Sequence, residues 1–73
     1  MNPLKFDVFG RTVLVERGAD GWQAFYPGVE GKRRHATDIV IPPQIEAHDI
    51  ERYLADLCHE WATSRHQTVR RLS

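Results

Sequence analysis

"LKFDVFGRTVLVER", residues 4–17, decides the fold of this chain of 73 residues. Apolar and polar residues alternate along most of residues 4–9, which is the pattern of a β-strand with one buried face. Residues 12–17 are rich in β-branched side chains, which favour a second strand. Gly10-Arg11 predicts a two-residue type II′ turn, because glycine adopts the positive φ that its first central position requires. The stretch therefore predicts an antiparallel hairpin.

This turn also predicts which side chains lie opposite each other across the hairpin. The apolar pairs on one face are Val8 with Val13 and Phe6 with Val15. On the other face Lys5 lies opposite Glu16, and opposite charges directly across an antiparallel pair attract. The agreement between the two faces supports the hairpin.

A third strand is predicted for residues 22–26, after a turn at residues 18–21. If all four turn residues form the loop, three side chains of this strand join the apolar face: Trp22, Ala24 and Tyr26. Phe25 then lies opposite Leu14 on the other face, near Phe9. A loop shorter by one residue would exchange the two faces, since side chains alternate along a strand.

Two further elements complete the predicted fold. Asp38–Ile41 is a candidate fourth strand that ends at the Pro42-Pro43 pair. A helix is predicted from Glu46 or Ala47 to Ala62 or Thr63. Its apolar side chains follow the spacing of one helical face: Ile50, Tyr53, Leu54, Leu57, Cys58 and Trp61.

The predicted fold class is α+β, with a three- or four-stranded antiparallel meander and one C-terminal amphipathic helix packed on one face. Residues 1–63 form the single domain. Residues 64–73 lack apolar periodicity, which predicts a mobile C-terminal tail.

Composition narrows the classes of function. Ten Lys and Arg balance ten Asp and Glu, and a net charge of zero argues against a dedicated nucleic-acid binder. The single cysteine, Cys58, excludes an intrachain disulfide and favours a reducing, cytoplasmic location. No apolar run is long enough for a signal peptide or a transmembrane segment, so no membrane association is expected.

The sequence predicts no enzyme, no cofactor and no metal site. His59-Glu60 begins like a zinc-protease helix, but Thr63 stands where the second histidine would be needed. Cys58 and His59 are neighbours, and adjacent helical side chains diverge too far to form a nucleophile–base pair. Cys58 also falls on the apolar helical face, where a small hydrophobic role is expected.

The basic segment Lys32-Arg33-Arg34-His35 is expected to be a loop. Three alternatives remain open for its charges. They are solvated, or they pair with acids of the helix or of a second copy, or they contact phosphate. An anion or an acidic partner is therefore the candidate ligand of Lys32, Arg33 and Arg34.

Four stretches, residues 6–11, 30–34, 38–43 and 53–62, resemble a family of short uncharacterised bacterial proteins, a domain of unknown function. The resemblance implies no active site. Residues 20–31 are also similar to the first sheet of HicB-type antitoxins, which is followed by a helix packed on the sheet. The chain departs from the HicB pattern at residues 32–38, where HicB proteins have Gly-Thr and an acidic helix start.

We therefore expect a small non-catalytic protein-interaction module with an unknown protein partner, self-associating as a homodimer. Its predicted contact surface is the sheet face away from the helix, with Phe9, Leu14 and Phe25. The alternative is a nucleic-acid-associated or antitoxin-like regulator that uses the basic loop 32–35 and the basic tail.

Overall fold

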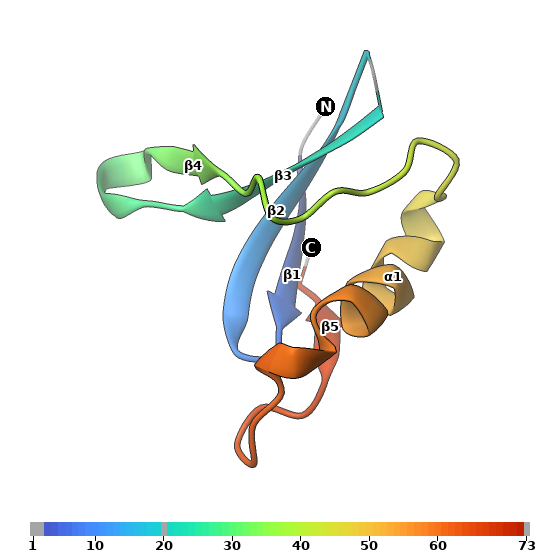
Figure 1. Cartoon of the computed structure of the whole chain (residues 1–73). Coiled ribbons are helices and arrows are strands. Elements are labelled where there is room, and N and C mark those ends of the chain that lie inside the picture. The colour runs from blue at the N-terminus through green and yellow to red at the C-terminus, as the bar shows by residue number, and fades with distance from the viewer. Residues whose placement is uncertain (1–2, 20, 73) are drawn as a thin grey trace.

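The computed structural model describes residues 3–19 and 21–72. In this part of the chain the strands form a five-stranded antiparallel sheet in the order β4-β3-β2-β1-β5 (Figure 1). The strands are β1 (Leu4–Val8), β2 (Arg11–Gly18), β3 (Gly21–Pro27), β4 (Arg33–His35) and β5 (Val69–Arg71). The helical segments are α1 (Ile50–Leu57) and the 3-10 turns η1 (Val29–Gly31), η2 (Ala47–Asp49) and η3 (His59–Trp61). The fold is α+β, as predicted, but the described sheet has five strands instead of the predicted three or four.

The first turn lies at Phe9-Gly10, not at Gly10-Arg11. Phe9 and Gly10 have φ of 50° and 88°, the two positive values of a type I′ turn, and the Gly10 N–H donates to the Asp7 carboxylate at 2.9 Å. Phe6 consequently lies opposite Val13, and Lys5 lies opposite Leu14 instead of Glu16. The register differs by two residues from the predicted one. Because side chains alternate with a period of two, the predicted apolar face is preserved.

The second hairpin confirms the predicted register. Leu14 lies opposite Phe25, and Val15 lies opposite Ala24. Even-numbered side chains of β3 therefore share the face of the four fully buried residues of the first hairpin. These residues are Phe6, Val8, Val13 and Val15.

The two segments after β3 differ from their predictions. Arg33–His35, expected to be a loop, forms strand β4, in which Arg34 lies opposite Tyr26. Residues 38–41 form no strand and cross the core face of the sheet as a covering segment (Figure 1). Ile39 and Ile41 are each only 5% exposed in this segment. Four residues after this segment, the carbonyl oxygen of Ile45 accepts a hydrogen bond from the Trp22 indole N–H at 2.7 Å, which holds the chain against the sheet.

Helix α1 is shorter than predicted, because 3-10 turns replace both ends of the expected helix. The line of contact with the sheet follows Ile50, Leu54 and Cys58, which are 0%, 0% and 4% exposed. Leu57, predicted to be in the core, is 43% exposed. The buried line follows the i, i+4, i+8 spacing of one helical face, which Leu57 flanks at the border with solvent.

The structure places a strand in the segment that was expected to be a mobile tail. β5 pairs with the outer edge of β1, with Val69 opposite Val8 and Arg70 opposite Asp7. Val69 is 9% exposed, and the Leu72 N–H donates to the Lys5 carbonyl at 2.7 Å. Residues 69–71 thus complete the sheet.

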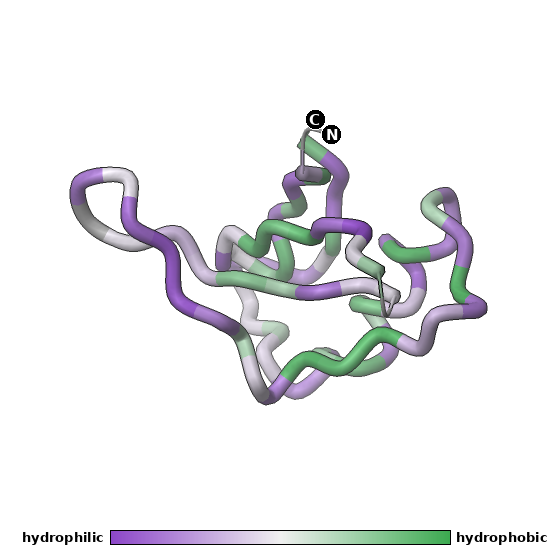
Figure 2. Tube along the Cα trace, turned by 90° about the horizontal axis from the view of Figure 1, so that it is seen from above, coloured by the Kyte–Doolittle hydropathy of each residue, from purple (hydrophilic) through white to green (hydrophobic). Residues whose placement is uncertain are grey.

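The β3–β4 hairpin extends away from the rest of the molecule in both views (Figures 1 and 2). The tube in Figure 2 is strongly hydrophilic along β4 and hydrophobic along the segment that crosses the core. The hairpin tip therefore contributes polar surface and not core.

Candidate functional site

The sheet has a covered face and an open face. Helix α1 and the segment of residues 36–45 lie on the covered face, which contains the core. The strand registers place five side chains in a line across the open face, one from each strand or its direct extension. We call this line the cross-sheet row: Leu72, Lys5, Leu14, Phe25 and His35.

The cross-sheet row is apolar at three of its five positions. Leu72 is 47% exposed, while Leu14 and Phe25 are half-buried. Lys5 lies between the two leucines, where its methylene stem can cover apolar surface while its ammonium group stays in water. The row therefore places apolar side chains on both sides of Lys5 across the sheet.

Phe25 lies between two basic side chains of β4. The His35 ring stacks on it at 4.9 Å between ring centroids, and the Arg33 guanidinium carbon lies 4.0 Å from the Phe25 centroid. Arg33 also donates two hydrogen bonds to the Glu16 carboxylate, at 2.9 and 3.0 Å. These bonds hold the pKa of Glu16 below its usual value. The Arg33 charge is thus balanced within the chain by β2 and not by the helix.

The structure separates the three predicted basic contacts. Lys32 precedes β4 and is exposed, Arg33 lies on the open face, and Arg34 lies on the covered face over the ring of Tyr26 at 5.8 Å. Successive side chains of a strand point to opposite faces, so a strand cannot present Arg33 and Arg34 as one patch.

The predicted apolar patch is only partly assembled. Leu14 and Phe25 are opposite each other on the open face, as predicted. Phe9 lies in the first turn, is 8% exposed and joins the buried core, so it does not contribute to an exposed surface. The predictions missed Leu72, because the short strand that positions it carries no periodic signal.

Cys58 and one cluster of acids with a histidine are the candidate reactive or metal-binding groups away from the cross-sheet row. Burial, with a smaller effect of Asp38, raises the pKa of the Cys58 thiol, which keeps it protonated and unreactive at neutral pH. Glu46, His48 and Asp49 bring carboxylate and imidazole atoms within 4.8 Å of one another. All three are exposed, and each His48 ring nitrogen lies 3.4 Å from a carboxylate oxygen, so contacts among the three side chains account for the cluster.

A small α+β domain with one covered and one open sheet face is the class that this geometry defines. The chain belongs to the family described as a domain of unknown function, DUF7661, whose model matches residues 3–73. This confirms the resemblance to a family of unknown function. No curated protein and no solved structure matches the chain. No helix in residues 3–19 and 21–72 is long and apolar enough to cross a membrane.

Proposed function

We propose that this protein is a small non-catalytic protein-interaction module that self-associates through the open face of its sheet. The observation that carries the proposal is the cross-sheet row, which brings Leu14, Phe25 and Leu72 onto the face of the sheet that α1 does not cover. An apolar strip framed by charged groups is typical of surfaces that bury against another protein.

The charges around the row favour a second copy of the chain as the occupant. The open face carries two acids, Asp7 and Glu16, which pair with Arg70 at 3.3 Å and with Arg33 at 2.9 Å. Because both acids are already paired with arginines, they add no net charge to the face, and Lys5 of the row can turn its ammonium group toward water, which limits like-charge repulsion between two copies. A two-fold symmetric dimer is the commonest arrangement for a contact of a face with itself.

The two edges of the sheet are poorly suited to self-association by strand pairing. β4 and β5 are each three residues long and carry two arginines each. Short, charged edge strands oppose edge-to-edge pairing, because a second strand would bring like charges together. The face is therefore the better surface for a second copy.

The alternative role as a nucleic-acid-associated regulator has less support. Arg33 and Arg34 lie on opposite faces of the sheet, and Arg33 is engaged with Glu16. Phosphate binding needs several cations on one surface, and it weakens steeply with salt. Binding to random duplex DNA at two salt concentrations separates the two roles.

Sedimentation velocity at tens of micromolar chain tests the proposal. The wild type should sediment as a dimer, and Leu14→Glu or Leu72→Glu should give a folded monomer. Val40→Glu is the matched control, because Val40 is 70% exposed and belongs to the segment on the covered side. A wild-type monomer at this concentration would refute the proposal. Equal dissociation by Val40→Glu would refute the assignment to the open face.

A further inference from the structure

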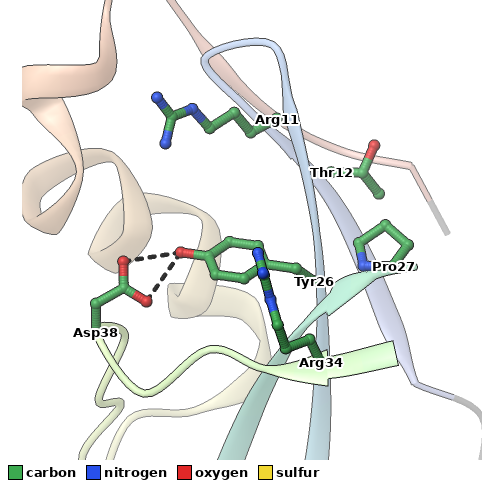
Figure 3. Close-up of a pocket in the computed structure, with 6 residues that line it drawn as sticks. All are labelled: Arg11, Thr12, Tyr26, Pro27, Arg34 and Asp38. Carbon is green, nitrogen blue, oxygen red and sulfur yellow. Dashed lines mark hydrogen bonds between the residues drawn. The ribbon is translucent and has the colours of Figure 1, made fainter. Parts of the chain in front are cut away.

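A second surface feature lies where strands β2 and β3 separate. The two strands pair from Leu14 opposite Phe25 to Gly18 opposite Gly21. Beyond Phe25, β3 continues beside β4, while the start of β2 continues beside β1. The gap is an open hollow of about 530 Å³ (Figure 3). Its lining residues are Arg11, Thr12, Tyr26, Pro27, Arg34 and Asp38.

Pro27 explains why the strands separate at this point. The Ala36 N–H donates to the Ala24 carbonyl at 2.8 Å, so the polar backbone groups of Ala24 face β4. Backbone groups alternate along an antiparallel strand, and those of Pro27 therefore face β2 at the level of Thr12. Proline has no N–H to donate, so the ladder between β2 and β3 ends before this pair.

Two arginines from different strands line the hollow. The Arg11 guanidinium carbon lies 4.4 Å from the ring centroid of Trp61, and that of Arg34 lies 5.8 Å from the centroid of Tyr26. Ring contacts occupy the flat face of a guanidinium and leave the N–H groups in its plane available. Within residues 3–19 and 21–72, no carboxylate lies within ion-pair distance of either guanidinium group, and neither guanidinium group donates a hydrogen bond.

The acid in the wall of the hollow is engaged by a tyrosine. The Tyr26 hydroxyl donates to both oxygens of Asp38, at 2.9 and 3.0 Å (Figure 3). Burial, followed by this hydrogen bond, raises the pKa of Tyr26 to about 12, so the hydroxyl remains a donor at neutral pH. Two guanidinium charges against one carboxylate leave the wall with an excess of positive charge.

We propose that this hollow binds an oxyanion, a carboxylate or phosphate group, through the guanidinium groups of Arg11 and Arg34. The planar fork of a guanidinium matches both kinds of group and binds them with two parallel hydrogen bonds. The two arginines belong to the covered side of the sheet, so binding through them does not depend on self-association through the cross-sheet row.

The test is an NMR titration of the ¹⁵N-labelled protein with inorganic phosphate and, in a second arm, with acetate, at constant ionic strength in sodium chloride. Saturable shifts at Arg11, Thr12, Tyr26 and Arg34 with either anion support the site. The tighter of the two anions identifies the preferred group. Linear, non-saturating shifts with both anions would overturn the proposal.

Variants with equal changes in net charge locate the anion. The double variant Arg11→Gln/Arg34→Gln should weaken binding at least about tenfold, since charged hydrogen bonds are lost at both positions. The control Arg17→Gln/Arg52→Gln removes two arginines that do not line the hollow and should keep the affinity within about twofold. Equal weakening in both double variants would overturn the assignment.

Asp38→Asn is expected to tighten phosphate binding, and an unfolded variant would not show this effect. Removing one negative charge from the wall should tighten phosphate binding about threefold, as expected for unit charges about 6 Å apart in a water-like medium. Unchanged or weaker binding by a variant with a dispersed, folded spectrum would place the anion elsewhere. Leu72→Glu, at the β5 edge of the sheet, should leave phosphate binding unchanged, which separates this test from that of the dimer.

Discussion

Two leucines on helix α1 give the sharpest test of the packing described above. Leu54 is 0% exposed in the core, whereas Leu57, three residues further along, is 43% exposed. Truncating a fully buried leucine to alanine costs about 2–5 kcal/mol, because contacts are lost and a cavity remains. The same change at Leu57 should cost about 1 kcal/mol or less, since much of the side chain already contacts water and alanine is the better helix former.

The difference should be large relative to the stability of so small a domain. A chain of 73 residues at roughly 0.05–0.15 kcal/mol per residue has about 4–11 kcal/mol of stability. Leu54→Ala therefore removes a substantial fraction, and the melting temperature should fall by at least about 8 °C at 4–8 °C per kcal/mol.

Urea unfolding followed by tryptophan fluorescence measures both variants against the wild type. The slope of the unfolding free energy against urea concentration should be the same in all three proteins. This equality is the control that shows that the unfolded state has not changed. Equal losses for Leu54→Ala and Leu57→Ala would refute the described orientation of α1, and so would a larger loss at Leu57.

Three further outcomes are expected. A chain ending at Ser64 should melt at least about 6 °C lower in calorimetry, because burial of a valine such as Val69 contributes about 1.5–3 kcal/mol; an unchanged melting temperature would show that β5 does not stabilise the sheet. Absorbance near 295 nm should show Tyr26 ionising near pH 12, and this transition should be absent in Tyr26→Phe. Because folding raises the pKa of Tyr26, the protonated tyrosine stabilises the folded state below pH 10, and this contribution to the unfolding free energy is lost as the pH rises toward 12. Because folding lowers the pKa of Glu16, its pairing with Arg33 should stabilise the protein above about pH 4.5 and be lost at lower pH, and Glu16→Gln should flatten the acid limb of a thermal-melting pH profile.

The sequence predicts which side chains of the two central hairpins face the core, because this depends only on the alternation of apolar and polar residues along each strand. Phe6 and Val13 reach the core although the turn lies one residue earlier than predicted. The turn itself was misplaced because Gly10 satisfies two turn types, and the sequence does not show whether glycine is the first or the second central residue.

The edges of the sheet could not be predicted, because three residues are too few to show a period. β5 pairs with β1 across more than sixty positions of sequence, and nothing local in Val69–Arg71 indicates that partner. The hollow was missed for the same reason. Arg11 in β2 and Trp61 in η3 are far apart in the sequence, and only the folded chain brings the guanidinium carbon to 4.4 Å from the ring centroid.

The two basic segments form strands of the sheet, which their charged composition does not predict. Arg33-Arg34 and Arg70-Arg71 become the two edge strands, at opposite sides of the sheet. On each edge, alternation sends one arginine to the open face, where it pairs with an acid of a neighbouring strand: Arg33 with Glu16, and Arg70 with Asp7. The remaining arginine of each edge points to the covered side, where Arg34 lines the hollow. Charged edges disfavour further strand pairing. The Arg33–Glu16 pair crosses the cross-sheet row at Phe25, and the rest of this row is the surface on which we propose that a second copy packs.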